Sequence, residues 1–185
     1  PEGEHLKKIS KSKNYDLKKK MFVNRRQNEM DLERENTSFI DMSKKFFFGG
    51  GENRKPDEKL PTVKPFFKDF VGEHSEVKFI WFGHSTILVN IEGKLVLFDP
   101  VFSTYASPLV FFNKRFHDAV IKLKELPPID YVVISHDHYD HLDYEAIEYF
   151  VKTKTKFITP LGVSSYLHGW GISKERTIEL DWWEN

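Results

Sequence analysis

The sequence predicts an α/β fold, in which antiparallel strands come first and strands alternate with helices afterwards. Short runs of β-branched and aromatic residues occupy residues 77–82, 87–91 and 95–98, separated by Gly83 and by Glu92-Gly93. Such runs between turn residues are typical of strands, and the last two are expected to form a hairpin. The change to alternating strands and helices further along the chain is typical of α/β domains.

The second part of the pattern lies after residue 128. Residues 129–134 form an apolar run expected to be a buried strand, and residues 156–158 are expected to form a shorter one. Asp143 precedes a segment, up to about residue 152, whose apolar residues share one helical face, so Asp143 is expected to cap a helix. Residues 161–168 are expected to form another helix.

Residues 1–71 differ from the rest in composition. They are rich in Lys, Arg, Asn and Glu and have no sustained helical or strand period, which predicts a polar, loosely ordered N-terminal extension and linker. A short helix near residues 31–43 is the exception that we expect. Residues 72–185 are expected to form a folded domain. The chain starts at Pro1 rather than methionine and stops abruptly, so we expect an N-terminal fragment.

Composition excludes several classes of function. The 28 Lys and Arg balance the 28 Asp and Glu, so a nucleic-acid partner is disfavoured. The absence of cysteine excludes disulfides and thiolate metal sites. Uncharged stretches at residues 79–91 and 100–113 are shorter than the ~18 to 20 residues of a membrane-spanning helix. We expect a cytoplasmic or peripheral membrane location, with a targeting segment upstream of Pro1 left open.

Four metal-ligating side chains directly follow the strand at residues 129–134. They are His136, His138, Asp140 and His141. In an extended segment the first three would point the same way, and a turn before the helix could bring His141 toward them. Imidazole nitrogens and carboxylate oxygens are zinc ligands, and the set suits two adjacent ions. The alternative is a polar loop whose histidines only form hydrogen bonds around a helix start.

The pattern His136-x-His138-x-Asp140-His141 resembles the signature of the metallo-β-lactamase superfamily. Over about residues 77–185 the chain further resembles the phospholipases D that hydrolyse N-acyl-phosphatidylethanolamine and their bacterial relatives. The segments that carry this resemblance are Trp81-Phe82-Gly83-His84-Ser85-Thr86, Asp99-Pro100-Val101-Phe102-Ser103, Leu126-Pro127-Pro128-Ile129-Asp130, the run from Ile134 to Tyr144, and Glu179-Leu180-Asp181-Trp182-Trp183.

The resemblance implies a metallo-β-lactamase-like αββα sandwich, of which only the first half is present, with two Zn²⁺ per complete site. It also implies a phosphodiesterase of phospholipase D type, with a phospholipid substrate and Asp140 in a catalytic role as a ligand. The products would be an N-acylethanolamine and phosphatidic acid. The other ligands of such enzymes, two His and one Asp, would lie beyond residue 185, so we expect residues 1–185 alone neither to fold stably nor to turn over substrate.

Three further residues are candidates for supporting roles. The resemblance suggests that Asp99 accepts hydrogen bonds from the ligand loop and so orients it; the alternative is a turn aspartate before proline. His84 either faces the metals or satisfies a nearby carbonyl. Tyr139 occupies a position that contacts substrate in the resembling phospholipases, and otherwise its ring packs under the loop. Trp182 and Trp183 are expected to be core aromatics.

Lysines adjoin phenylalanines at residues 44–48, 64–68 and 111–116. One interpretation is an interfacial patch that seats the protein on a bilayer. The other is that the rings cover the domain while the charges stay solvated. We favour the second for the first two segments and leave the third open.

Two other functions remain compatible with these residues. The same metals could serve hydrolysis of another small ester, lactone or phosphodiester, because a fold and a metal site do not fix the substrate. The chain could also be a non-catalytic remnant that kept the loop. Iron or manganese would accept the same ligands as zinc.

Overall fold

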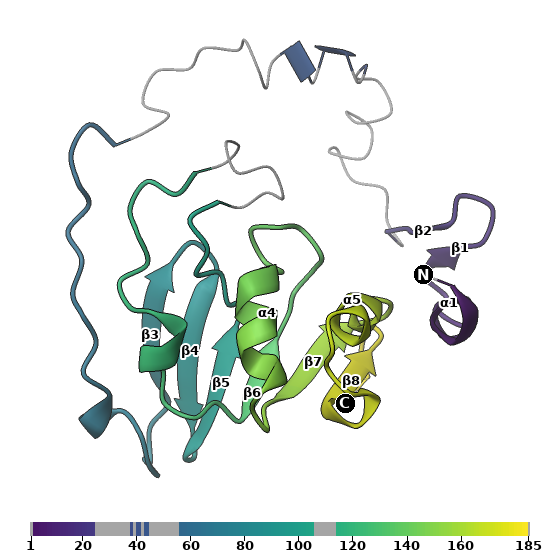
Figure 1. The fold of residues 1–185 in the computed structure, drawn as a ribbon. Coiled ribbons are helices and arrows are strands. Elements are labelled where there is room, and N and C mark those ends of the chain that lie inside the picture. Colours follow the sequence, from purple (N-terminus) through teal and green to yellow (C-terminus); the bar gives the residue numbers. More distant parts are fainter. Residues whose placement is uncertain are drawn as a thin grey trace.

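The computed structural model describes residues 2–24, 38, 40–41, 43–44, 56–105 and 114–184. Its main feature is a six-stranded sheet whose strands follow one another in space in the order of the sequence (Figure 1). The first three strands are antiparallel, and the last three are parallel to the third. They are β3 (Lys78–Gly83), β4 (Thr86–Ile91), β5 (Lys94–Phe98), β6 (Tyr131–Val133), β7 (Lys156–Pro160) and β8 (Thr177–Leu180).

The α/β class is thus confirmed, and five of the six strands lie where the sequence predicts them. The exception is β8, for which no strand was expected. Its sequence Thr-Ile-Glu-Leu has no run of apolar residues, and its central Glu179 is charged. The strand forms because its backbone completes the ladder of β7, a tertiary effect that a local pattern does not show.

Helices cover one face of the sheet (Figure 1). Asp143 caps α4 (Tyr144–Val151) as predicted, since its side chain accepts a hydrogen bond from the Glu145 amide at 3.0 Å. The next helix, α5 (Ser164–Gly169), starts three residues later than expected, because Gly162 has a φ of +90° and belongs to a turn. Single 3₁₀ turns lie at η1 (Phe67–Asp69), η2 (Leu123–Glu125) and η3 (Lys174–Arg176).

The core lies between α4 and the inner face of the sheet. Paired residues on neighbouring strands form one buried row, and Ile147 and Phe150 of α4 join the same cluster. The row consists of Leu88, Leu97, Val132 and Phe157. Burial of these side chains is the main source of the sheet's stability.

The outer face of the sheet is also apolar. One row crosses all six strands and consists of Trp81, Ile87, Phe98, Val133, Ile158 and Ile178. Trp81 and Ile178 are exposed, and the others are half-buried. A sheet that is apolar on both faces suits an architecture with a further layer.

The N-terminal segment, defined here as residues 2–24, is ordered. It forms α1 (Gly3–Ile9) and a hairpin of β1 (Tyr15–Asp16) and β2 (Met21–Phe22). Ile9 is buried, and Lys8 Nζ lies 3.2 Å from Glu179 Oε2 of β8. In this segment, contacts with residues far along the chain supply order that the polar composition does not suggest, and the expectation for residues 1–71 as a whole stays a prediction.

Other expectations for the first part of the chain have different outcomes. The helix predicted near residues 31–43 lies almost wholly outside the described residues. The boundary at residues 71 and 72 stays a prediction, although Phe67 and Phe70, just before it, pack with the core. No helix within the described ranges is long and apolar enough to cross a membrane.

A first prediction concerns the core. Phe157→Ala should lower the free energy of unfolding of the complete protein by about 3–5 kcal/mol, because it removes a fully buried ring. Phe66→Ala, at a ring that is 72% exposed, should change it by less than about 0.5 kcal/mol. Urea denaturation monitored by circular dichroism measures both. Equal effects of the two substitutions would contradict this core.

A second prediction concerns pH. Burial tends to raise the pKa of Glu179, but hydrogen bonds from Ser164 and Gly162 and the charge of Lys8 outweigh it, so the pKa falls below its usual 4.5. A carboxylate with a depressed folded-state pKa contributes stability above its unfolded pKa, and this is lost as pH falls through the folded value. Glu179→Gln should therefore lower the melting temperature at pH 7 and have a smaller effect below about pH 4.5.

The matched control is Glu148→Gln, at an exposed carboxylate of α4. It should leave the melting temperature unchanged at both ends of the pH range. A Glu179→Gln effect that is the same at pH 3 and pH 7 would contradict the charged state of this group.

Candidate metal centre

Three segments meet at one edge of the sheet. Because β5 and β6 are parallel, their carboxyl ends lie at the same edge, and the chain continues there into Asp99 and Ser135. The turn between β3 and β4 reaches the same edge, because β4 runs antiparallel to β5. It carries His84 and Ser85. The carboxyl ends of parallel strands are where α/β proteins commonly bind ligands.

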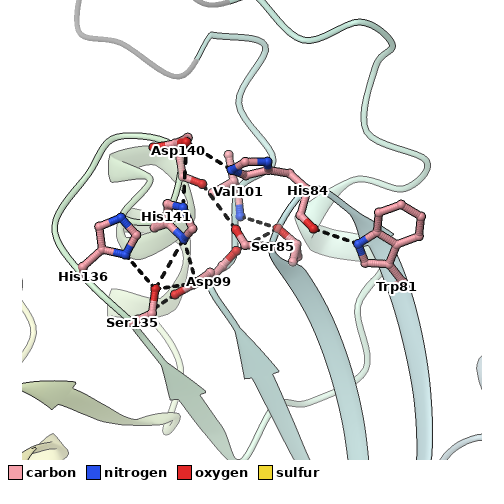
Figure 2. A network of polar contacts seen from close by, with 10 residues as sticks. Trp81, His84, Ser85, Asp99, Val101, Ser135, His136, Asp140 and His141 are labelled. Atoms are coloured by element: carbon pink, nitrogen blue, oxygen red, sulfur yellow. Dashed lines mark hydrogen bonds and ion pairs between the residues drawn. The ribbon is translucent and has the colours of Figure 1, made fainter. Parts of the chain in front are cut away.

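Asp99 connects these segments. Its side chain is almost fully buried, and Oδ1 accepts a hydrogen bond from the Ser135 amide at 2.7 Å. Oδ2 accepts one from the Ser135 hydroxyl at 2.7 Å and lies 2.8 Å from His141 Nδ1 (Figure 2). The position fits the predicted supporting role, which itself stays a prediction.

These contacts determine which ring nitrogen of His141 and of His136 is engaged in a hydrogen bond and which is available to bind a metal. The carboxylate of Asp99 only accepts, so His141 Nδ1 carries a hydrogen, and in the neutral ring Nε2 is then the nitrogen with the lone pair. The Ser135 hydroxyl donates to Asp99, so its oxygen accepts from His136 Nδ1 at 2.9 Å. In its neutral form each of the two histidines would therefore present an unprotonated Nε2, through which a neutral imidazole binds metal.

The structure brings Asp140 and His141 together with His84. One ligand atom from each of these three residues lies within 4.8 Å of the other two. His84 Nε2 lies 3.0 Å from Asp140 Oδ2, and His141 Nε2 lies 3.8 Å from the same oxygen. Of the two interpretations of His84, facing the metal ligands is the one that this geometry favours.

His136 and His138 lie beside this cluster rather than in it. The ring of His136 is 3.9 Å from that of His141 and 4.5 Å from that of His138, centroid to centroid. His136 lies on the opposite side of His141 from His84 (Figure 2). The four predicted ligands thus form one continuous group, and their role as ligands stays a prediction.

Electrostatics favour the protonation states that bind metal. Burial, together with the neighbouring His141 and His138, lowers the pKa of His136 and so favours its neutral form. Burial tends to raise the pKa of Asp140, but hydrogen bonds and the nearby His141 and His84 outweigh it, and the net pKa is lowered. Neutral imidazoles and an ionised carboxylate form a donor set that fits zinc, iron or manganese.

Two other residues of the loop, Tyr139 and Asp137, are not part of the cluster. Tyr139 is 59% exposed, which does not fit a ring packed under the loop, so substrate contact stays the prediction for it. The carboxylate of Asp137 accepts a hydrogen bond from the Tyr166 hydroxyl at 3.3 Å.

Sequence reasoning missed the second function of Asp143. Besides capping α4, its Oδ2 accepts hydrogen bonds from the amides of Phe102 and Ser103, at 2.8 and 2.9 Å. It thereby fixes the segment that follows Asp99. No local signal reveals these contacts, because the partners lie about forty residues away in sequence.

A cavity of about 380 Å³ lies on the His84 side of the cluster, and Asp140 lines it too. We call it the basic cavity, because Lys114, Arg115 and His117 also line it. Arg115 donates from Nη1 to the Val101 carbonyl at 2.6 Å. Burial lowers its pKa, yet a guanidinium stays charged at neutral pH. A half-buried cation thus lies beside the candidate metal ligands.

The tryptophans near the C-terminus are not core residues in this structure. Trp182 is 56% exposed and Trp183 is 90% exposed, so that expectation is wrong for the described part of the chain. Trp182 packs against Phe22 of the N-terminal segment, with the ring centroids 5.8 Å apart. Its partner thus comes from the opposite end of the chain.

A third prediction follows for Asp99. Asp99→Asn should weaken zinc binding by the complete protein by about 10- to 100-fold, because the amide no longer holds His141 in the metal-binding tautomer. Competition with a chromogenic chelator measures the affinity. Asp69→Asn, at an exposed carboxylate of η1, is the control and should bind zinc as the unsubstituted protein does. Unchanged affinity in Asp99→Asn would contradict this role.

Comparison with known proteins identifies the family. Residues 94–185 match the family model described as "Beta-lactamase superfamily domain". An uncharacterised protein of Mycobacterium tuberculosis is 42% identical over 130 residues, which are 69% of this chain and 34% of that protein. The N-acyl-phosphatidylethanolamine-hydrolyzing phospholipase D 1 of Caenorhabditis elegans is 36% identical over 135 residues, 70% of this chain and 38% of that one.

More distant proteins match as well. A UPF0173 metal-dependent hydrolase of Caldivirga maquilingensis is 32% identical over 87 residues, 47% of this chain and 33% of its own. The solved structure of the metallo hydrolase Igni18 from Ignicoccus hospitalis is 28% identical with a TM-score of 0.41, covering 57% of this chain and 40% of that one. The chain spans about a third of the length of the curated relatives that it matches. Over residues 94–185, the chain belongs to the β-lactamase superfamily.

Proposed function

We propose that the complete protein is a metal-dependent hydrolase of lipid phosphodiesters, of phospholipase D type. Its substrate would be N-acyl-phosphatidylethanolamine, and its products an N-acylethanolamine and phosphatidic acid. The observation that carries the proposal is the group of metal ligands adjoining the basic cavity. Relatives from Caenorhabditis elegans and Saccharomyces cerevisiae, named for this activity and 36% and 34% identical, support it.

The residues that would hold the metal are His136, His138, Asp140 and His141, with His84 next to them. We propose two Zn²⁺ per complete site, with the remaining ligands beyond residue 185. When bound, the ions would polarise a phosphoryl oxygen and lower the pKa of water. The two histidines bonded to Ser135 and Asp99 are already oriented for this role, which reduces the cost of assembling the site.

The chain's own residues would bind and place the phosphodiester. The charge of Arg115 beside His84 and Asp140 would attract the phosphate and hold it near the ligands. Asp140 would stay ionised as a ligand because its pKa is lowered. Tyr139, exposed at the centre of the loop, would contact the substrate.

The membrane would be the source of such a substrate. We propose peripheral contact, with a cytoplasmic or membrane-surface location. Phe116 is exposed beside Lys114 and Arg115, as an interfacial patch requires. Residues 111–113 of that segment, and 45–48 of the first one, lie outside the described residues. In the second segment, Phe67 packs against the core while Phe66 is exposed.

A second candidate is hydrolysis of a different ester, lactone or small phosphodiester. This second candidate is supported by the UPF0173 relatives, which are named only as metal-dependent hydrolases, without a substrate. A remnant without catalysis is the third candidate. The metals can also differ from zinc, since iron and manganese accept the same donors.

The decisive assay uses the complete protein with zinc, iron or manganese supplied in turn. Release of N-acylethanolamine from N-acyl-phosphatidylethanolamine, abolished by a chelator and restored by one of these metals, is the expected result. Turnover of only a lactone or a small soluble phosphodiester would replace the proposal with the second candidate. No turnover of any of these would favour the remnant.

A fourth prediction concerns Arg115. Arg115→Gln should lower kcat/KM for the lipid phosphodiester by at least about tenfold, because charged hydrogen bonds contribute about 1.5–3 kcal/mol. Arg115→Lys, which keeps the charge, should recover part of the loss. Lys124→Gln, at an exposed cation of η2, is the control and should have no effect. Equal activity of Arg115→Gln and the control would remove Arg115 from substrate binding.

A further inference from the structure

A second cavity adjoins the ligand loop on the side away from the basic cavity. It has a volume of about 490 Å³ and lies between the N-terminal segment and the chain around Gly162. We call it the apolar cavity. The volume falls within the range of about 300–1,000 Å³ that is usual for small-molecule sites. We propose that the apolar cavity holds the aliphatic chain of the substrate and that the β1–β2 hairpin forms one of its walls.

The lining supports an aliphatic occupant. Ile9, Met21 and Phe22 face the cavity from the N-terminal segment, and Leu161, Val163 and Trp182 face it from the other side. Burial of hydrocarbon against such side chains is favourable in proportion to the apolar area removed from water. Methionine adapts to chains of different shape because its side chain is unbranched and flexible.

Part of the lining of the apolar cavity comes from the segment that carries the candidate metal ligands. Ser135, His136 and Asp137 line the cavity there. The rings of His136, His141 and His84 follow one another (Figure 2). Because His136 lines the apolar cavity and His84 lines the basic one, the ligand group lies between the two cavities. An amphiphile could place its anionic group near Arg115 and its chain beside Met21, with the scissile bond between them. This inference rests on the proposed function for the identity of that amphiphile.

The wall is attached to the domain. The Glu179 carboxylate pairs with Lys8 and also accepts a hydrogen bond from the Gly162 amide at 2.7 Å. Ile9 packs directly on Gly162, where an added Cβ would lie 2.7 Å from Ile9 Cδ1. Ring contacts then continue from Tyr15 to Phe22 and on to Trp182. These contacts hold the N-terminal segment, including the β1–β2 hairpin, against the turn at Gly162 and against Trp182.

The test changes the wall without removing a core residue. Met21 is 54% exposed and lines the apolar cavity, whereas Leu17, in the same hairpin, is 65% exposed and does not line it. Met21→Gln keeps the side-chain length but removes its apolar character, and Leu17→Gln is the matched control. We expect Met21→Gln to raise KM for a long-chain N-acyl-phosphatidylethanolamine by about tenfold. KM for a short-chain analogue should not change, and Leu17→Gln should change neither.

A binding measurement without metal separates this inference from the proposed function. The probe is 9,10-dibromostearate, whose bromines quench nearby tryptophan, added below its micelle concentration to the metal-free complete protein. Trp182 is isolated as the difference between the unsubstituted protein and Trp182→Phe. We expect saturable quenching of Trp182, with about tenfold weaker binding in Met21→Gln and unchanged binding in Leu17→Gln.

The outcomes are distinct. Hydrolysis of N-acyl-phosphatidylethanolamine with the same chain-length preference in Met21→Gln and the unsubstituted protein would overturn the inference and leave the proposed function intact. Absence of Trp182 quenching would also overturn it. Quenching that depends on Met21, in a protein that releases no N-acylethanolamine, would retain the chain site and reject the proposed substrate.

Discussion

The buried carboxylate of Asp99 is the interaction on which the rest of the site depends. A charge in this position is costly unless hydrogen bonds compensate it, and Asp99 obtains them from the backbone and hydroxyl of Ser135 and from His141. These partners come from the segment after β6 and from the ligand loop, while Asp99 itself directly follows β5. Satisfying one carboxylate therefore also fixes the spacing of two strands and the direction of two imidazoles. The backbone of Asp99 adds a third connection, because its carbonyl accepts a hydrogen bond from Thr86 at the start of β4.

The sheet provides a rigid base for this arrangement because apolar rows cross it on both faces. The inner row packs under α4, which begins at Asp143, and Asp143 in turn holds the segment after Asp99. Core packing and ligand placement are thus coupled through two aspartates. Loops that carry functional groups are commonly less ordered than the elements that they connect. Here buried hydrogen bonds at both ends of the loop offset that tendency.

Much of the fold and of the candidate site could be predicted from the sequence. The parts that could not be predicted have one physical cause in common. The ligand loop and most strands depend on residues close together in sequence, such as the spacing of His136 to His141 or the apolar run before Ser135. The N-terminal segment, β8 and the second set of hydrogen bonds of Asp143 depend on partners far away along the chain. Ile9 is one apolar residue in a charged stretch, and only its contact with Gly162 makes it an anchor. Trp182 is the opposite case. Its large aromatic side chain suggests a core position, but in the structure it borders a cavity.

The backbone at two site residues has a consequence for the variation that the site can accept. His84 and Asp99 have φ angles of +47° and +39°, in the left-handed region that residues other than glycine rarely adopt. Asparagine and aspartate tolerate this conformation, whereas β-branched residues do so poorly. The backbone at these two positions can therefore accept Asn, Asp, His or Gly at little conformational cost. Valine, isoleucine or threonine would require a different backbone conformation at these turns. The backbone alone therefore restricts which residues these two positions accept, in addition to any chemical requirement.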